Sequence, residues 1–212
     1  MVVGVLKEPQ EETRVSLIPE AVSALIKKGV TVLVEKDAGA KSSASDEAYE
    51  QAGAKISTAQ NIVNEADVIL SIHHPKIEIP ASKVMIGVYL PLYNRDAVES
   101  WANKNLTVFS LDMLPRTTRA QTMDVLSSQA NISGYKAVLL AANLYPRYFP
   151  MFMTAAGSIA PAKLLILGAG VAGLQAIATA KRLGAVVEVF DTRPAVKEEV
   201  MSLGAKFVEV EG

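Results

Sequence analysis

Three glycines lie between an apolar run and a helix-like pattern near the end of the chain: Gly168, Gly170 and Gly173. Glycine at the first position permits a tight turn out of a strand, and glycine at the second lets the backbone approach a phosphate closely. Glycine at the third lets the next helix pack against the strand. That helix would point free N–H groups and the positive end of its dipole at an anion. The spacing therefore predicts a turn that binds the diphosphate of a dinucleotide.

The surroundings of these glycines strengthen the prediction. An apolar strand is expected before them, over 164–167, and the next predicted strand ends in Asp191, which lies 21 positions after Gly170. An acid at this place can accept hydrogen bonds from the adenosine ribose, which favours NAD over NADP. Arg193 is the opposing observation, because an arginine there also accommodates a 2′-phosphate; its alternative interpretation is a solvated loop charge. For the whole stretch, the alternative is a glycine-rich α/β turn that binds nothing. The predicted cofactor-binding residues are Gly168, Gly170, Val171, Ala172, Gly173, Asp191, Thr192 and Arg193.

A second group of candidates lies in the polar stretch RTTRAQTMDVLSS. Arg116, Gln121, Asp124 and Ser127 follow one another at intervals of five, three and three residues. From Gln121 on, these intervals predict side chains along one face of a helix, with Arg116 in the turn before it. Such groups could bind a carboxamide or a ribose, since glutamine offers both a donor and an acceptor. The alternative is the solvated start of a helix.

Two further sets of residues have weaker signals. His73 and His74 are the only histidines, and one of them could act as an acid or base, but a structural or solvent-facing role is favoured. No cluster has metal-ligand spacing, so no metal site is predicted. Lys7 and Arg14 flank a turn before the first helix. Arg14 could pair with a substrate carboxylate or simply form a surface salt bridge.

The elements that would position these residues alternate between strand and helix. Strands are predicted over 2–6, 31–35, 55–57, 67–72, 83–88, 107–110, 164–167 and 185–191, and helices over 19–28, 46–51 and after Gly173. This alternation predicts an α/β fold of two Rossmann-like doubly wound domains with mostly parallel sheets, the second of them truncated. The chain also repeats itself, because KKGVTVLVEK is echoed by KRLGAVVEVFD and EAYEQAGAKI by EEVMSLGAKF. The first copy lacks the glycine turn and should not bind a diphosphate by itself.

Three segments are predicted along the chain. Residues 1–118 form a Rossmann-like domain without the phosphate fingerprint, 119–147 an interdomain helix, and 148–212 the first half of an NAD-binding Rossmann domain. The helical pattern of 119–145 is one long helix or two abutting ones, broken at Gly134. The tract YPRYFPMFMTAAGSIAPA is expected to be a linker. Its aromatic and methionine side chains are expected to pack, with a partner-facing surface as the alternative. The last strand of the second domain is expected to end in AKFVEVEG.

Composition limits the classes of function. The chain has 212 residues, 50% of them apolar, and a net charge of −1. This balance, with no lysine- and arginine-rich block, argues against nucleic-acid binding. There is no cysteine, which excludes disulfides and thiolate sites and is compatible with a cytoplasmic protein. The start MVVGVLKEPQ is not expected to be a signal or transit peptide, and no apolar run is long enough to span a membrane.

Four stretches of the sequence resemble those of a known family. The stretches that carry the resemblance are KEPQEETRVSLIPEAV, RAQTMDVLSSQANISGYKAV, FPMFMTAAGSIAPAKLLILGAGVAGLQAIATAKRLGAVVEVFDTR and KEEVMSLGAKFVEV. They are similar to the NAD(H)-binding component, the first domain of the alpha subunit, of proton-translocating nicotinamide nucleotide transhydrogenases. The similarity covers essentially the whole chain.

The resemblance implies a function and a set of partners. NAD bound here would accept hydride from NADPH on an NADP(H)-binding subunit, coupled to proton translocation by a membrane-spanning subunit. The family's nicotinamide-proximal loop maps onto Arg116, Gln121, Asp124 and Ser127, its ribose-binding acid onto Asp191, and its phosphate glycines onto Gly168, Gly170 and Gly173. The resemblance also implies a homodimer in the cytoplasm, peripheral on the inner membrane through its partner subunits.

Alanine dehydrogenase shares the fold and is the main alternative. That enzyme uses a lysine in the strand that here reads ILSIHHP, and a histidine where this chain has Pro91 in YLP. Hydride passing between two nicotinamide rings leaves no alcohol or amine proton to remove, so a transhydrogenase can lack both groups. What it must supply is an approach of about 3 to 3.5 Å and exclusion of water. A third alternative is a non-catalytic NAD-binding module.

Overall fold

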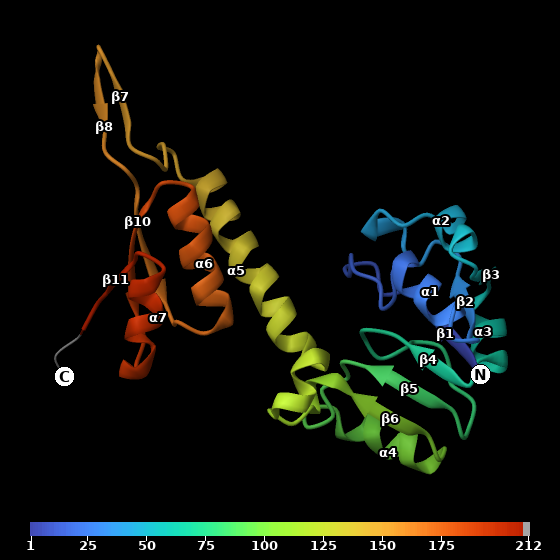
Figure 1. The fold of residues 1–212 in the computed structure, drawn as a ribbon. Coiled ribbons are helices and arrows are strands. Elements are labelled where there is room, and N and C mark those ends of the chain that lie inside the picture. Colours follow the sequence, from blue (N-terminus) through green and yellow to red (C-terminus); the bar gives the residue numbers. More distant parts are fainter. Residues whose placement is uncertain (210–212) are drawn as a thin grey trace. The chain divides into compact units, whose positions relative to one another are not determined.

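The chain folds into two compact units, Met1–Asp124 and a second that begins at Val125 (Figure 1). The structure is a computed structural model, and it describes residues 1–209. Each unit is built on its own parallel sheet. The predicted α/β fold class with Rossmann-like parallel sheets is confirmed.

The first unit contains a six-stranded parallel sheet in the order β3-β2-β1-β4-β5-β6. This is the strand order of the doubly wound dinucleotide-binding fold. The strands are β1 (Val2–Val5), β2 (Thr31–Glu35), β3 (Lys55–Ser57), β4 (Val68–Leu70), β5 (Val84–Gly87) and β6 (Thr107–Ser110). The helices are α1 (Pro19–Ile26), α2 (Asp46–Gln51), α3 (Ala59–Glu65) and α4 (Arg95–Asn103), with short 3-10 helices at Ala40–Ser42, Leu111–Met113 and Thr118–Met123.

Both faces are buried at β1, β2 and β4, because alternate residues of these strands enter different clusters. In β2, Val32 and Val34 pack with residues of α1 and α2, whereas Leu33 packs with α3 and α4. A strand covered on both faces has an apolar, buried centre, as Val32, Leu33 and Val34 give this one. Gly4 in β1 allows the close approach of α3, since a Cβ there would lie 2.4 Å from a side-chain carbon of Ile62.

The second unit repeats the first half of this arrangement. Its sheet has the order β11-β10-β9, with all pairs parallel. The elements are α5 (Val125–Leu144), β7 (Phe152–Thr154), β8 (Gly157–Ile159), β9 (Lys163–Leu167), α6 (Val171–Arg182), β10 (Val186–Phe190), a 3-10 helix at Pro194–Val196, α7 (Lys197–Ser202) and β11 (Lys206–Phe207). Residues 210–212 of the predicted last strand lie outside the described residues.

The predicted break at Gly134 is wrong, because α5 runs through it without interruption. Helices α5 and α6 pack against each other within the second unit. A Cβ at Gly134 would lie 2.0 Å from the carbonyl oxygen of Ala172, so glycine is needed here for close helix packing. A glycine inside a helical pattern can mark a helix break or a close contact with another helix, and the sequence alone does not distinguish the two.

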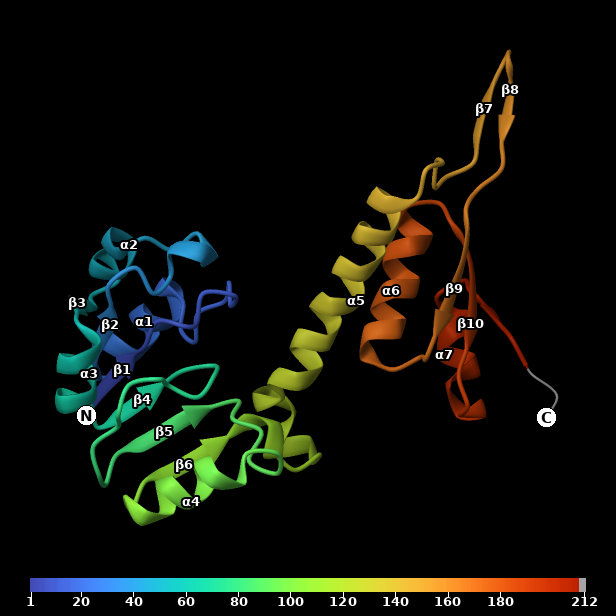
Figure 2. The ribbon, with the colours of Figure 1, turned by 180° about the vertical axis from the view of Figure 1, so that it is seen from behind.

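The tract between α5 and β9 is more ordered than a linker, since β7 and β8 pair as an antiparallel hairpin. Figure 2 shows this hairpin extending beyond the sheet of its own unit. The expectation that its large apolar side chains pack holds for Phe149. It is wrong for Tyr148, Met151, Phe152 and Met153, which are exposed. Among the described residues, no helix is long and apolar enough to cross a membrane.

Candidate functional site

The glycine turn joins β9 to α6 in the second unit. Gly168 has a φ of +97°, which L-residues with a side chain rarely adopt. Its N–H donates to the carbonyl oxygen of Phe190 at 2.7 Å, so the turn begins where β9 and β10 are still paired. Helix α6 starts at Val171, and its first repeating hydrogen bond runs from Leu174 N to Gly170 O at 2.9 Å. The amides of the first helical turn therefore have no acceptor within the helix.

The three glycines differ in what requires them. Gly173 is required by packing, since a Cβ there would lie 1.9 Å from the carbonyl oxygen of Gly168. Gly168 is required by its positive φ. Gly170 is exposed, its φ is −81°, and a Cβ there would meet no atom within 4 Å. No contact of the described chain therefore explains glycine at position 170.

Asp191 lies beside this turn, at the residue after β10, where the sequence predicted an acid. Its Oδ2 accepts from the amide of Ala169 at 2.7 Å, and its Oδ1 accepts from the amide of Arg193 at 2.8 Å. The Arg193 guanidinium adds two bonds of 3.0 Å, from Nε to Oδ1 and from Nη2 to Oδ2. The structure thus brings Asp191, Ala169 and Arg193 together.

These bonds fix the charge of the pair. The side-chain hydrogen bonds from Arg193, and then the amide of Ala169, hold the pKa of Asp191 well below its usual range. In turn, Asp191 raises the pKa of Arg193. Both groups are therefore ionised at neutral pH. Of the other predicted residues, Val171 and Ala172 form the first turn of α6, and Thr192 is exposed between Asp191 and Arg193.

The polar stretch of the second candidate group is divided between the two units. Arg116 is exposed in an irregular segment, and Gln121 is exposed in the 3-10 helix Thr118–Met123. Asp124 ends that helix with a ψ of 84°, and Ser127 lies in the first turn of α5. The prediction that Gln121, Asp124 and Ser127 share one helical face is wrong, because the non-helical backbone of Asp124 separates two helices.

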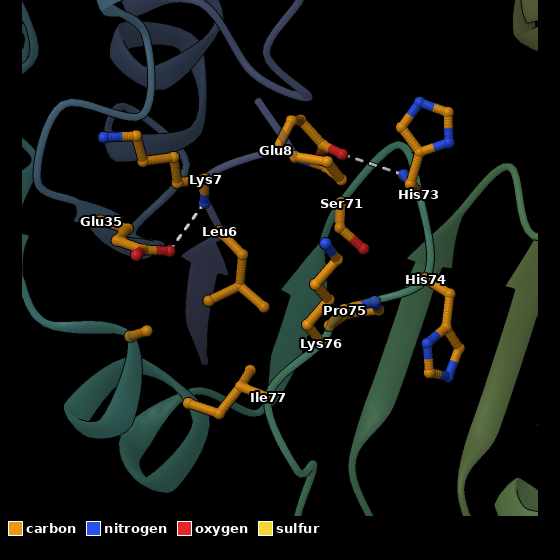
Figure 3. Close-up of a pocket in the computed structure, with 12 residues that line it drawn as sticks. Leu6, Lys7, Glu8, Glu35, Ser71, His73, His74, Pro75, Lys76 and Ile77 are labelled. Carbon is orange, nitrogen blue, oxygen red and sulfur yellow. Dashed lines mark hydrogen bonds between the residues drawn. The ribbon is translucent and has the colours of Figure 1, made fainter. Parts of the chain in front are cut away.

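A cavity of about 310 Å³ opens in the first unit at the carboxyl ends of β1, β2 and β4 (Figure 3). The strand order reverses between β1 and β4, and doubly wound folds bind ligands beside such a point. The polar residues that line the cavity are Lys7, Glu8, Glu35, Ser71, His73, His74 and Lys76. Sequence analysis missed Glu8, Glu35, Ser71 and Lys76. Their positions at or just beyond the ends of neighbouring parallel strands were the available signal.

The wall of this cavity is held by carboxylates that accept from backbone amides. Buried Glu8 accepts from the amides of Ile72 at 2.5 Å and His73 at 3.0 Å, and Glu35 accepts from the amide of Lys7 at 2.7 Å. Beside these carboxylates, the cavity residue Ser71 and its buried partner Tyr89 are uncharged. Ser71 Oγ lies 3.0 Å from the Tyr89 hydroxyl, and burial raises the pKa of Tyr89 to about 12.

Arg14 forms an ion pair, which was one of its two predicted roles. Its Nη2 lies 2.6 Å from Oε2 of Glu12, and the same oxygen lies 2.8 Å from Nε2 of His73. Hydrogen bonds from Arg14 are the main reason that the pKa of Glu12 lies far below its usual range, although desolvation opposes them.

The two histidines point away from each other in Figure 3, and both lie beyond the end of β4, which stops at Leu70. His74 stacks on Trp101 with ring centroids 5.2 Å apart. The indole N–H of Trp101 donates to His74 Nε2 at 3.1 Å. Both imidazoles therefore have partners in the chain, in agreement with the structural role favoured from the sequence.

Together, these features define a class. The chain is an α/β protein with one doubly wound unit and a second unit that repeats its first half, with a glycine turn and a following acid in the second. Family models identify it further: "Alanine dehydrogenase/PNT, N-terminal domain" matches residues 4–133, and "Alanine dehydrogenase/PNT, C-terminal domain" matches residues 137–211. The chain belongs to this family.

Individual relatives agree with that assignment. The chain is 46% identical to an NAD(P) transhydrogenase alpha subunit of Rickettsia prowazekii, over 99% of this chain and 57% of the relative. It matches the crystal structure of a transhydrogenase from Sinorhizobium meliloti with a TM-score of 0.95 and 48% identity, over 99% of this chain and 64% of the other. It is 28% identical to an alanine dehydrogenase of Staphylococcus saprophyticus, over 96% of this chain and 56% of that enzyme. The chain thus spans little more than half the length of these curated relatives.

The His74–Trp101 contact generates a pH prediction. Burial lowers the pKa of His74 below 6.5, so the unfolded chain takes up this proton at a higher pH than the folded one. The stabilisation is present above about pH 6.5 and is lost as the pH falls, because imidazolium cannot accept the indole N–H. Losing this hydrogen bond costs about 1 kcal/mol. Trp101 is the only tryptophan, so its fluorescence should titrate below pH 6.5.

A matched pair of variants tests the assignment. His74→Gln keeps an acceptor for the indole without titrating, so the fluorescence change should disappear. His73→Gln should retain it. An unchanged titration in His74→Gln would assign the signal to another group.

Proposed function

We propose that this chain is the NAD(H)-binding part of a proton-translocating NAD(P) transhydrogenase, with the diphosphate of NAD at the turn between β9 and α6. The single observation that supports this most is Gly170, which no contact within the described chain requires to be glycine. A ligand that approaches the backbone closely supplies the missing reason. The transhydrogenase named among the relatives, at 46% identity, supports the same conclusion.

The residues of the turn suit a dinucleotide. The amides of Val171, Ala172 and Gly173 lie in the first turn of α6, where donors without helical acceptors can bind phosphate oxygens. Asp191 is ionised and adjacent, as an acid that accepts from ribose hydroxyls must be. NAD rather than NADP follows from this carboxylate, which would repel a 2′-phosphate.

The proposed hydride transfer requires no general base from the protein. Bound NAD supplies the nicotinamide ring that exchanges hydride with NADPH on another subunit. Because that transfer releases no substrate proton, the chain needs groups that position the ring rather than a general base. We assign this positioning to Arg116, Gln121, Asp124 and Ser127, as the resemblance implies. In the first unit, Glu8 already binds the amides that follow β4, which agrees with the absence of a phosphate turn there.

The partners follow from the same assignment. An NADP(H)-binding subunit would face this chain, and a membrane-spanning subunit would couple the reaction to proton translocation. The chain would then lie in the cytoplasm, peripheral on the inner membrane. The proposed homodimer is supported by the hairpin β7–β8, where Met151, Phe152, Met153 and Ile159 are exposed. Residues 151–162 contain no charged side chain, which suits a surface that a second copy covers.

One observation favours a second candidate, alanine dehydrogenase-like oxidation of an amino acid. The cavity of the first unit presents Lys7 and Lys76 beside the strand ends, and these cations could attract a carboxylate. The lysine and histidine that such enzymes use are replaced at their own positions, however, so this function ranks below the first. A module that only binds NAD is separated from both by the activity assay below.

Gly170→Ala tests the proposed nucleotide site. The free energy of unfolding should change by at most about 1 kcal/mol, the usual cost of alanine at a helix N-cap. The affinity for NADH should fall about tenfold or more, roughly 1.4 kcal/mol, because the methyl group would meet the diphosphate. Calorimetric titration with NADH and thermal unfolding by circular dichroism measure the two effects.

Gly173→Ala is the matched control, since it lies in the same turn but would collide with the backbone of Gly168. It should destabilise the second unit by about 2 kcal/mol, a typical cost of overpacking. Unchanged NADH affinity in Gly170→Ala would contradict the proposed site.

The reaction itself is tested with Gln121→Ala. Reduction of an NAD analogue by NADPH, with the NADP(H)-binding subunit added, should slow about 100-fold through lost ring positioning. NADH affinity should change by less than about threefold, because the diphosphate contacts remain. The exposed neighbour Thr122→Ala is the control. Equal rates in Gln121→Ala and the wild type would contradict the positioning role of Gln121. No NADPH-dependent reduction by the wild type would favour a binding module, and NADH production from alanine and NAD would favour the dehydrogenase.

The proposed dimer is tested with a charge in the hairpin. Phe152→Glu should convert dimers to monomers in sedimentation, because a buried unpaired carboxylate costs several kcal/mol. Met201→Glu places the same charge at an exposed position of α7 and should leave the dimer intact. Dissociation by both variants, or by neither, would exclude the hairpin as the interface.

A further inference from the structure

The carboxylate of Asp191 is fully used within the chain. A carboxylate has about four acceptor positions, two on each oxygen. Oδ1 accepts from the amide and from Nε of Arg193, and Oδ2 accepts from the amide of Ala169 and from Nη2 of Arg193. Four donors therefore meet four positions, and none remains for a ribose hydroxyl.

These four donors differ in how firmly they are held. The amides of Ala169 and Arg193 belong to the backbone of the turn and of the segment after β10. The two guanidinium bonds depend on a side chain that is 60% exposed, whereas the Asp191 side chain is only 6% exposed. An exposed arginine can leave such a pair at low cost, because water solvates it and salt screens the attraction.

We propose that the Arg193 guanidinium occupies the place of the ribose diol, so that a nucleotide binds only by displacing it from Asp191. This inference rests on the proposed function, because it concerns the same nucleotide site. The guanidinium presents two parallel donors to the carboxylate. The vicinal hydroxyls of an adenosine ribose present two donors as well. Arg193 is thus an internal competitor of the ligand.

Displacement gives Arg193 a second role that depends on the nucleotide. A bare Asp191 repels a 2′-phosphate strongly, but an arginine released beside it can pair with that phosphate. Arg193 therefore weakens NADH binding and assists NADPH binding. Glu199 also attracts Arg193, but this attraction does not reverse the opposite effects of Arg193 on NADH and NADPH binding. With Arg193 present, the preference for NADH over NADPH is therefore smaller than Asp191 alone would give.

Two variants separate the competing and the assisting role. In Arg193→Ala the competitor is absent, so the affinity for NADH should rise about threefold to tenfold, and the affinity for NADPH should fall about fivefold. Arg193→Lys keeps the charge but has no planar fork, so NADH should again bind more tightly while NADPH is retained. Arg182→Ala removes an exposed arginine from the last turn of α6 and should change neither affinity.

The measurement is calorimetric titration of each chain with NADH and with NADPH, up to millimolar concentration. Tighter NADH binding in both Arg193 variants supports the inference. If the wild-type chain binds NADH and Arg193→Ala binds it equally or more weakly, the inference fails and the proposed function stands. If neither the wild type nor any variant binds NADH, the proposed function fails and the inference fails with it. If only Arg193→Ala binds, displacement is supported and the wild-type chain is blocked by its own arginine.

Discussion

The glycine turn of the second unit, where the nucleotide is proposed to bind, depends on one backbone contact, the approach of Gly173 to the carbonyl oxygen of Gly168. The two residues come so close that no Cβ fits between them. This contact places the first turn of α6 directly beyond the end of β9, with its free amides at the edge of the sheet. Asp191 completes the arrangement, because its bond to the amide of Ala169 ties the end of β10 to the turn. Contacts within the second unit therefore position the turn, the start of α6 and Asp191 relative to one another.

The second unit shares the strand order of the first half of the first unit, but the two sheet edges carry different groups. In each, the ends of neighbouring parallel strands meet at one edge of a sheet, where ligands of doubly wound folds bind. In the second unit, that edge presents free amides. In the first unit, Glu8 takes the amides that follow β4, and carboxylates and lysines surround a cavity instead. The difference lies in a few residues after the first strand, and the surrounding architecture is shared.

Beside the glycine turn, the charge of Asp191 is balanced by Arg193. Arg193 neutralises Asp191 and covers it, so the acid that would select NAD is not presented as a bare charge. A carboxylate left unpaired beside helix amides would be bound by whatever cation or donor came first. The chain's own arginine satisfies this carboxylate, and in the proposed displacement the ribose would compete with it.

Much of this was determined by the sequence alone. The period of apolar residues predicted the strands of the two parallel sheets and the helices α1, α2, α5 and α6, because a parallel strand buried on both faces, such as β2, has an apolar centre. It did not predict α3, α4 or the hairpin β7–β8. Gly168, Gly170, Gly173 and Asp191 were predicted from spacing, since a strand, a tight turn and a helix start are local events in the chain. Local patterns also predicted that the first unit lacks this turn.

Only the tertiary structure decided the rest, because it depends on contacts between residues distant in sequence. Gly134 looked like a helix break, and it is the point where α5 packs against Ala172. Glu8 and Lys76 became cavity residues through the pairing of β1 with β4. Phe152 and Met153 are exposed because they lie in an antiparallel hairpin, which the pattern of apolar residues did not predict. The sequence indicated Arg193 as a charge near the proposed ribose position, but its two side-chain hydrogen bonds to Asp191 could be seen only in the fold.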